Sequence, residues 1–328
     1  MNTIHDVLII GAGLSGLSAA HFLQKLQPQT NVLILEKSDR PGGAIRSFLA
    51  EGFHAEWGPH GFLNNTEESL ELLKDTGLIN KVQKAPLGDF VRFVCNRGRL
   101  VELPQSPPKL LTTPLLSPFD KLRLLADLWI KPDPADQTIG AWAGKRFGKG
   151  VLHLVDAAVS GTFAGDLNRL SINSVMPGVR DLEIEYGSVL KGLKNKKKLA
   201  GSKPKDLPAM LSFPQGIEQF THILAEKKSI QFNTTVTTIE RKDDTWLVTA
   251  NGKTFLTKNL IVALPVNASL RLLGRLSKPP TSKVPVAKIV NVVMGFAASA
   301  QVPRGFGYLA PERENRFTMG AMFSSHMF

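Results

Sequence analysis

The sequence is short of cysteine and of long apolar runs, and each shortage excludes a class of protein. Cys95 is the single cysteine among 328 residues, so neither a disulfide framework nor a cysteine-based zinc site is available. The best candidate for a bilayer span, residues 284–302, is interrupted by Pro285, Lys288 and Asn291. The opening residues, MNTIH, lack the charged and apolar regions of a signal peptide. We therefore expect a location in the reducing cytoplasm.

Acidic residues are also scarce relative to basic ones. The chain has 28 Asp and Glu against 40 Lys and Arg, a formal net charge of +12, which favours an acidic partner such as anionic lipid or a polycarboxylate substrate. Seven lysines lie in residues 191–205, which we interpret as a solvated, mobile loop in preference to a membrane-binding patch. The run lacks interleaved aromatic residues, so no nucleic acid partner is expected.

The order of local patterns predicts an α/β protein. Residues 5–36 read as strand, glycine-rich turn, helix and strand, which is a βαβ unit. A helix is predicted at residues 66–80, with Thr66 as its N-cap and Gly77 as its stop. Five prolines in residues 104–118 indicate a domain crossing.

After the proline-rich run, residues 119–200 read as mainly helical. Strand patterns return at residue 229, carry a hairpin signal at Asn251-Gly252, and continue through residues 284–323. The helical block therefore interrupts a nucleotide-binding domain that the βαβ unit opens. No internal repeat is evident.

The turn after the first strand fits G-x-G-x-x-G, and it consists of Gly11, Ala12, Gly13, Leu14, Ser15 and Gly16. It opens a helix and is completed by Glu36 at the end of the next strand, the context that dinucleotide binding requires. The glycines allow a tight turn, close approach of a pyrophosphate, and close packing of helix on strand. Glu36 can accept both ribose hydroxyls and would repel a 2′-phosphate, which disfavours NADP and leaves FAD and NAD open.

Residues 36–47, EKSDRPGGAIRS, resemble the R-x-G-G-x-x-x-S/T extension of flavoproteins in the amine-oxidase superfamily, with Arg40, Gly42, Gly43 and Ser47 at the matching positions. This resemblance implies FAD. Five further segments resemble protoporphyrinogen oxidases in that family's order: residues 56–63, 103–125, 159–177, 213–220 and 303–314. In the fourth segment, Gln215 replaces the first of two paired glycines.

The resemblance implies FAD-dependent oxidation of protoporphyrinogen IX or coproporphyrinogen III to the porphyrin, in haem biosynthesis. Six electrons would leave through the flavin in two-electron steps, with dioxygen as the usual acceptor. No Ser-His-Asp or Cys-His set is evident, so no catalytic side chain is predicted and the flavin carries the chemistry. His21 and His153 lack paired ligands, and no metal is expected.

The same resemblance assigns cofactor-binding residues. The glycine turn from Gly11 to Gly16, together with Glu36, Lys37, Arg40 and Gly43, would bind the adenosine diphosphate part. Gly58, Pro59, His60 and Gly61 would lie along the isoalloxazine ring, although a lone loop histidine is more often structural. Val236 would contact the adenine side of FAD, and it is also an ordinary core strand residue.

Substrate residues follow in the same way. Arg92 matches an arginine that faces a substrate propionate, because a guanidinium fork suits a carboxylate; the alternative is a salt-bridged strand arginine. Phe306, Gly307 and Leu309 match an apolar pocket around the tetrapyrrole, and apart from the resemblance they read as core residues.

The resemblance also implies a division of the chain. Residues 1–88 and 208–268 would form a Rossmann-like FAD-binding domain, residues 105–207 an inserted, mainly helical, membrane-facing domain, and residues 89–104 and 269–328 a mixed-sheet substrate domain. Peripheral attachment to an anionic membrane is expected, and a homodimer is left open.

In the family a further segment with a second glycine-rich flavin motif follows the last matching strand. On that basis we expect this 328-residue chain to hold FAD weakly. Two alternatives remain: another FAD oxidoreductase, such as an amine oxidase or carotenoid desaturase, and a flavin-free lipid-binding protein that resembles Rab GDP-dissociation inhibitors.

Overall fold

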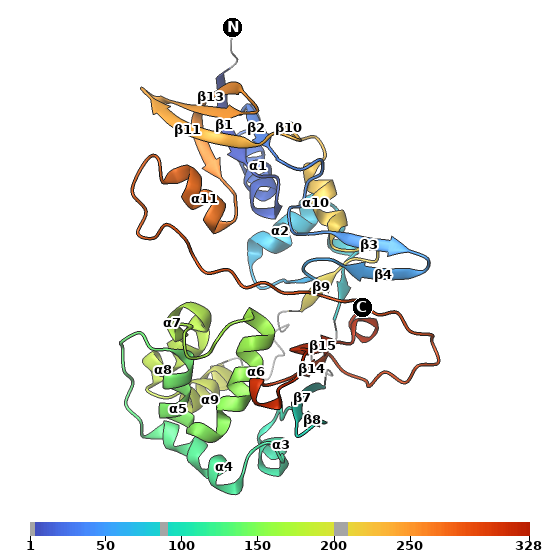
Figure 1. The fold of residues 1–328 in the computed structure, drawn as a ribbon, viewed down its shortest axis with the longest axis vertical. Coiled ribbons are helices and arrows are strands. Elements are labelled where there is room, and N and C mark those ends of the chain that lie inside the picture. Colours follow the sequence, from blue (N-terminus) through green and yellow to red (C-terminus); the bar gives the residue numbers. More distant parts are fainter. Residues whose placement is uncertain (1–3, 86–90, 200–208) are drawn as a thin grey trace. The chain divides into compact units, whose positions relative to one another are not determined.

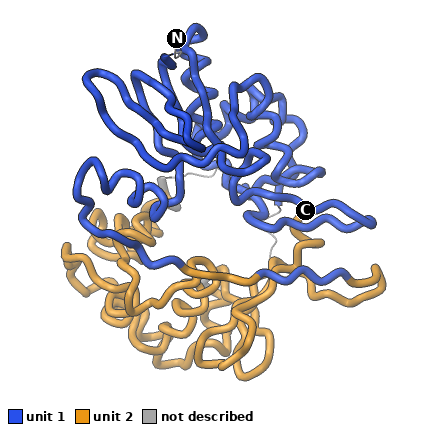
Figure 2. Tube along the Cα trace, turned by 45° about the horizontal axis from the view of Figure 1, so that its top comes forward, with its two compact units in different colours: residues 1–85, 208–286, 291–295 blue, residues 86–207, 287–290, 296–328 orange. Residues whose placement is uncertain are grey.

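A computed structural model describes residues 4–85, 91–199 and 209–328. The described residues form two compact units (Figure 2). Unit 1 lies within residues 1–85, 208–286 and 291–295, and unit 2 lies within residues 86–207, 287–290 and 296–328. The domain crossing indicated by the prolines of residues 104–118 falls inside unit 2. The division into three domains stays a prediction.

Unit 1 is built on a mixed sheet with the strand order β10-β2-β1-β13-β12-β11 (Figure 1). The strands are β1 (Ile4–Ile10), β2 (Val32–Leu35), β10 (Ile230–Gln231), β11 (Val236–Lys242), β12 (Thr245–Ala250) and β13 (Lys253–Val262). β10, β2, β1 and β13 pair in parallel, whereas β12 pairs antiparallel with both of its neighbours. Helix α1 (Leu14–Leu26) connects β1 to β2, which confirms the predicted βαβ unit.

Both faces of this sheet are covered, which explains why β1 and β2 are apolar at successive positions. Val7 and Ile9 pack in one cluster with residues of α1, α2 (Glu67–Asp75) and α10 (Glu218–Ala225). Leu8 and Ile10 pack in a second cluster on the opposite face, where α11 (Val266–Leu273) contributes a half-buried leucine. The sheet core therefore fixes the end of β1, where the glycine turn begins.

Two smaller sheets and a 3₁₀ turn, η1 (Leu78–Asn80), complete unit 1. β3 (Ser47–Ala50) and β4 (Phe53–Glu56) form an antiparallel hairpin, and β5 (Phe62–Leu63), β9 (Met210–Ser212) and β6 (Gln83–Lys84) form a three-stranded sheet.

Two local predictions in unit 1 are confirmed. The Thr66 side chain caps α2 by accepting a hydrogen bond from the backbone N–H of Ser69, and Gly77 follows the helix with a left-handed φ of 69°. Asn251 and Gly252 turn the β12–β13 hairpin, both with positive φ, as a type I′ turn requires.

Unit 2 combines a small sheet with a group of helices (Figure 1). The sheet order is β15-β14-β7-β8, from β7 (Arg92–Asn96), β8 (Arg99–Glu102), β14 (Gly307–Leu309) and β15 (Gly320–Met322). The helical elements are α3 (Pro107–Thr112), α4 (Pro118–Leu124), η2 (Leu125–Leu128), α5 (Ile139–Phe147), η3 (Lys149–Val151), α6 (Leu152–Phe163), α7 (Ile172–Val175), α8 (Pro177–Tyr186) and α9 (Val189–Leu199), and two 3₁₀ turns, η4 (Glu312–Glu314) and η5 (Ser324–His326), follow near the end. None of the helices within the described ranges is both long and apolar enough to cross a membrane.

The lysine-rich run is a helix where the structure describes it. α9 contains residues 191–199, so the loop prediction is wrong there, and residues 200–205 lie outside the described residues. Lysine is a good helix former. Gly192 also allows α9 to pack closely on α8, because a Cβ on this residue would lie 2.7 Å from the Cβ of Leu182.

The predicted strand pattern of residues 284–323 is largely absent. Within this range only β14 and β15 form, and residues 284–306 contain no strand. A strand needs the backbone of a neighbour to satisfy its N–H and C=O groups, and apolar alternation alone does not supply one. The apolar side chains of this segment are correspondingly exposed, with Val290 at 89% and Val292 at 71%.

Candidate functional site

The three glycines of the turn have different surroundings. Gly11 has a φ of +105°, and a Cβ on it would lie 2.6 Å from the Ala263 carbonyl oxygen. A Cβ on Gly16 would lie 2.0 Å from the Gly11 carbonyl oxygen. The first turn of α1 can therefore approach this oxygen only with glycine at position 16. A Cβ on Gly13 would meet nothing within 4 Å. The fold therefore requires the first and third glycines, whereas the second borders open space.

Glu36 is held against this turn. It is buried at the end of β2, with 6% of its surface exposed. Its Oε2 accepts a hydrogen bond of 2.8 Å from the backbone N–H of Ala12, and its Oε1 accepts one of 2.9 Å from the N–H of Ser38. A carboxylate has about four acceptor positions, so capacity for ribose hydroxyls is left. Lys37, the next residue, is exposed.

The segment that leads to Val236 lies beside Glu36. The backbone N–H of Glu36 donates to the Gln231 carbonyl oxygen at 2.9 Å, and the N–H of Thr234 donates to the Glu36 carbonyl oxygen at 2.8 Å. Val236 begins β11 and packs partly into the second core cluster of the sheet. The structure thus brings residues 231–234, which lead to Val236, next to Glu36 beside the glycine turn.

A second glycine pair packs on the first turn. The N–H of Gly42 donates to the Ala12 carbonyl oxygen at 2.8 Å, and Gly42 forms a parallel bridge with Gly13. Gly43 has a φ of +60°, and a Cβ on it would lie 3.5 Å from the Cα of Gly13.

The Arg40 side chain makes hydrogen bonds within the loop of residues 40–45. Its guanidinium donates to the carbonyl oxygens of Pro41, Gly43 and Ile45 at 2.9 to 3.0 Å, and to Oε1 of Glu218 at 3.2 Å. Arg40 therefore braces residues 40–45, and its direct contact with a cofactor stays a prediction.

Residues 57–61 start beside the same loop. The N–H of Trp57 donates to the Arg46 carbonyl oxygen at 2.9 Å, and a Cβ on Gly58 would lie 2.1 Å from the Ala44 carbonyl oxygen. Pro59 is exposed, whereas His60 and Gly61 are half-buried.

The environment of His60 keeps its ring neutral at pH 7. Burial lowers the pKa of His60 below the ordinary value of 6.5; the charge of Glu56 acts in the opposite direction, and His54 adds to the lowering. A neutral histidine fits the structural interpretation better than a charged contact.

Sequence reasoning missed a hydrogen-bonded set next to these turns, consisting of Ser47, Glu56 and Glu218. The hydroxyl of Ser47 donates to Oε2 of Glu56 at 2.7 Å, and the N–H of Ser47 donates to Oε2 of Glu218 at 2.9 Å. One signal was available: Ile217, the N-cap of α10, has no side-chain acceptor for the first N–H groups of the helix. Another part of the chain can then supply one.

Unit 2 brings the predicted substrate residues together on one sheet. Arg92 of β7 lies opposite Gly307 of β14 in a parallel pair, and the Arg92 guanidinium carbon lies 5.5 Å from the centre of the Phe306 ring. Among the described residues, no carboxylate forms an ion pair with Arg92. The role of Arg92 in binding a propionate stays a prediction.

Gly307 and Leu309 have structural roles in the same sheet. Gly307 has a φ of +140°, and a Cβ on it would lie 2.1 Å from the Ala321 carbonyl oxygen of β15. Leu309 is half-buried against Val94, Leu115 and Ala157. Their contact with a substrate stays a prediction.

Comparison with known proteins identifies the family. Residues 14–326 match the family described as flavin containing amine oxidoreductase. The chain belongs to this family.

Its relatives include porphyrinogen oxidases. The chain is 36% identical to the coproporphyrinogen III oxidase of Staphylococcus aureus (strain NCTC 8325 / PS 47), over 58% of this chain and 43% of that protein. It is 27% identical to the mitochondrial protoporphyrinogen oxidase of Nicotiana tabacum, over 98% of this chain and 72% of that protein. The match thus spans less than half of the length of the S. aureus relative.

The fold of this amine oxidoreductase agrees with that of solved structures. A putative protoporphyrinogen oxidase from Exiguobacterium sp. 255-15 superposes with a TM-score of 0.76 at 18% identity, over 100% of this chain and 74% of that one. At this identity the likeness shows the α/β fold alone.

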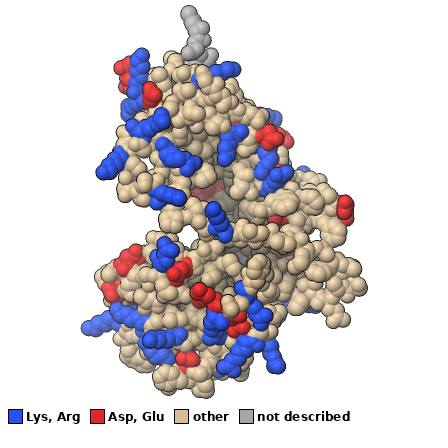
Figure 3. Space-filling view, in the orientation of Figure 1, with Lys and Arg blue, Asp and Glu red and all other residues tan. Residues whose placement is uncertain are grey.

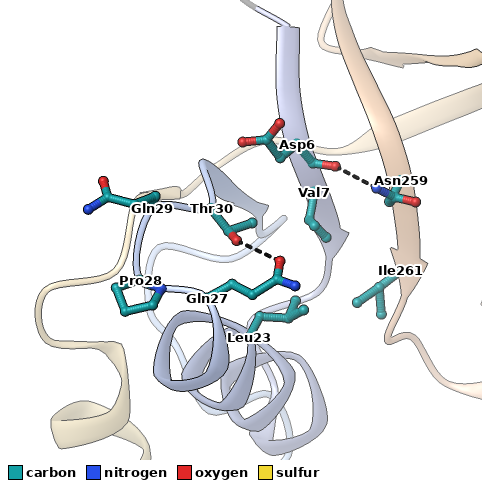
Figure 4. Close-up of a pocket in the computed structure, with 9 residues that line it drawn as sticks. All are labelled: Asp6, Val7, Leu23, Gln27, Pro28, Gln29, Thr30, Asn259 and Ile261. Atoms are coloured by element: carbon teal, nitrogen blue, oxygen red, sulfur yellow. Dashed lines mark hydrogen bonds between the residues drawn. The ribbon is translucent and has the colours of Figure 1, made fainter.

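One pocket of this family member lies elsewhere (Figure 4). It is lined at the start of β1 by Asp6 and Val7, and further by Leu23, Gln27, Pro28, Gln29, Thr30, Asn259 and Ile261. Ligands of such sheets bind beyond the carboxyl ends of the parallel strands. The pocket is therefore not the candidate cofactor site, which lies at the other end of β1.

On the face shown in Figure 3, Lys and Arg side chains are spread over both units. Within the described ranges, no three or more His, Cys, Asp or Glu side chains are grouped so that they could hold a metal ion. The expectation that no metal is needed stays a prediction.

Proposed function

We propose that the protein binds FAD in unit 1 and oxidises a porphyrinogen, either protoporphyrinogen IX or coproporphyrinogen III, to the porphyrin. The observation that carries the proposal is the position of Ala12. Its N–H donates to the carboxylate of Glu36, and its carbonyl oxygen accepts from Gly42. This residue thereby joins the ribose acceptor, the glycine turn and the second glycine pair. The relatives named as porphyrinogen oxidases support the choice of substrate.

The residues present fit this cofactor. The N–H groups in the first turn of α1 have no intrahelical acceptor and suit a pyrophosphate, and Gly13 borders open space there. We assign the adenosine diphosphate part to Gly11, Ala12, Gly13, Leu14, Ser15, Gly16, Glu36, Lys37, Arg40 and Gly43, the adenine side to Val236, and the flavin ring to Gly58, Pro59, His60 and Gly61.

When bound, the flavin supplies a two-electron acceptor, and three successive two-electron steps remove the six electrons of the reaction, with dioxygen as the proposed final acceptor. The chain itself binds and orients the substrate. The guanidinium of Arg92 can donate two parallel hydrogen bonds to a propionate. Phe306, which lies under that guanidinium, offers an apolar surface to the macrocycle. No side chain is assigned as an acid, base or nucleophile.

We expect the purified chain, titrated with FAD, to quench flavin fluorescence, and we expect the bound flavin to bleach under anaerobic conditions when protoporphyrinogen or coproporphyrinogen is added. An absorbance spectrum follows both events. Arg92→Met is expected to raise the half-saturating porphyrinogen concentration about tenfold, because hydrogen bonds to a charged group contribute about 1.5–3 kcal/mol. Arg99→Met, on the neighbouring strand β8, is the matched control.

Each result of that titration separates the candidate functions. A bound flavin that an amine, and not a porphyrinogen, reduces would replace the proposal with the amine-oxidase alternative. A folded chain that leaves the fluorescence of FAD unchanged would reject flavin chemistry and favour the lipid-binding alternative.

We further propose that unit 2 attaches peripherally to anionic membranes. Five large apolar side chains in the α3–η2 region are between 46% and 76% exposed: Leu111, Phe119, Leu122, Leu125 and Trp129. We call them the apolar patch. Four of them recur at helical spacing from α4 through η2 to the residue that follows it, and Lys109, Lys121, Arg123 and Lys131 lie in the same stretch. Apolar burial plus attraction to anionic lipid is the combination that holds a protein at a membrane interface.

Co-sedimentation with vesicles tests this attachment. We expect wild type to bind phosphatidylglycerol-containing vesicles, and Phe119→Ser together with Trp129→Ser to weaken binding at least about tenfold, since each side chain would lose its apolar burial. Leu26→Ser, which changes a leucine that is 79% exposed in unit 1, is the control. Equal binding by all three proteins would refute a membrane role for the patch.

A further inference from the structure

Helix α10 is capped by a distant hairpin and not by its own sequence. Its N-cap is Ile217, whose side chain cannot accept a hydrogen bond. The N–H of Ile217 instead donates to Oε1 of Glu56 at 3.0 Å, and the N–H of Glu218 donates to the hydroxyl of Ser47 at 3.1 Å. Two N–H groups at the start of α10 that have no intrahelical acceptor are therefore satisfied by the β3–β4 hairpin.

The contact is reciprocal. The carboxylate of Glu218 accepts from the N–H of Ser47, while the hydroxyl of Ser47 accepts from the N–H of Glu218. This exchange has the logic of a capping box, except that its partners lie 171 residues apart. Gly216 makes the approach possible, because a Cβ on it would lie 2.2 Å from the Ser47 hydroxyl oxygen. We call Ser47, Glu56 and Glu218 the latch.

Both carboxylates of the latch are largely buried and have polar partners. The side chain of Glu56 is 6% exposed and that of Glu218 is 17% exposed. His54 lies 2.9 Å from Glu56, and Arg40 lies 3.2 Å from Glu218. In addition, the N-terminus of a helix favours negative charge. Removing the carboxylate of Glu218 would leave the Ser47 N–H without its acceptor and would take one of four acceptors from the Arg40 guanidinium.

Both turns assigned to the cofactor are tied to the latch. Arg40, which Glu218 holds, donates to the carbonyl oxygens around Gly42 and Gly43. Glu56 precedes Gly58 by two residues, and Gly58 packs directly on the Ala44 carbonyl oxygen. A displacement at the start of α10 would therefore be transmitted to residues 40–45 and to residues 57–58.

We propose that Ser47, Glu56 and Glu218 are positioning residues for the cofactor: through α10 they hold residues 40–45 and 57–58 in the conformation that receives FAD. The inference rests on the proposed function, because it presumes that these turns bind FAD. Glu218 lies far in the sequence from residues 40–45 and 57–58, and none of the cofactor motifs gives it this positioning role.

The test compares Glu218→Gln with Glu226→Gln, which makes the same change at an exposed residue at the other end of α10. FAD dissociation constants come from fluorescence quenching, and amide hydrogen exchange of residues 40–47 is followed in the cofactor-free proteins. We expect Glu218→Gln to raise the dissociation constant at least about tenfold and to speed exchange in residues 40–47, with Glu226→Gln like wild type.

A rescue experiment separates positioning from simple loss of fold. We expect Ser47→Ala to lose FAD binding and Ser47→Thr, which keeps the hydroxyl, to retain it. The thermal midpoints of unfolding of the two variants are expected to be equal. If wild type binds FAD and Glu218→Gln binds it equally well, the latch has no positioning role and the proposed function stands. If wild type itself does not bind FAD, the proposed function fails, and the assigned role of the latch fails with it.

Discussion

Arg146→Met is expected to destabilise unit 2 by about 3–5 kcal/mol, because it would leave two buried carboxylates without their cation. Arg146 is 1% exposed, and it forms ion pairs with Asp127 and Glu183, which are 0% and 2% exposed. Urea denaturation followed by tryptophan fluorescence measures the loss, since Trp142 donates to Glu183 in the same cluster at 2.6 Å.

The reason for so large an effect is that this cluster joins several helices. Asp127 of η2 also accepts from the hydroxyl of Ser188 at 2.6 Å and from the N–H of Leu190 at 2.9 Å. Glu183 of α8 also pairs with Arg180. Every charged group therefore has several partners, and removing the central arginine disrupts them together.

Lys145→Met provides the matched control. Lys145 precedes Arg146 and pairs with Asp133, but the two side chains are 50% and 39% exposed. Such a pair contributes about 0–1 kcal/mol. If both variants lost the same small amount of stability, the buried cluster would not hold the helices together.

The cluster also makes the stability of unit 2 depend on pH. Burial by itself would raise the pKa of Glu183, but hydrogen bonds from Arg146, Trp142 and Arg180 outweigh it and hold the pKa below the ordinary value of 4.5. The folded-state pKa is thus depressed, so this stabilisation is present above pH 4.5 and is lost as the pH falls through the folded-state pKa. Arg146→Met is expected to reduce this acid dependence.

The parts of the fold that depend on a few consecutive residues were predictable from the sequence. The glycine turn, the Thr66 cap and the Asn251-Gly252 hairpin each depend on a few consecutive residues with special backbone or capping properties. Arg92 and Phe306 were found through resemblance alone, and the sheet of unit 2 brings them together.

The parts that depend on distant partners were not predictable. Local patterns cannot show that Glu56 and Ser47 cap a helix at residue 217, or that Arg146 meets Glu183. The same limit explains two errors. The apolar alternation of residues 284–306 says nothing about a neighbouring strand, and the lysines of residues 191–199 say nothing about the packing of α9 on α8 at Gly192.

Gly13→Ala is expected to weaken FAD binding on the order of 100-fold while leaving the fold intact, because the added methyl group would occupy the space through which a pyrophosphate approaches the backbone. The backbone of Gly13 has φ −71° and ψ 175°, which alanine adopts without strain, and its Cβ would meet nothing within 4 Å. The free energy of unfolding should therefore change by less than about 1 kcal/mol.

Gly16→Ala separates the two roles of glycine in this turn. Its Cβ would lie 2.0 Å from the Gly11 carbonyl oxygen, a backbone atom that cannot move without shifting α1 from β1. We expect a loss of about 1–3 kcal/mol or more in the free energy of unfolding even without cofactor. Urea denaturation of both cofactor-free variants, followed by FAD titration, distinguishes the effects. A Gly13→Ala chain that binds FAD as tightly as wild type would place the pyrophosphate away from this turn.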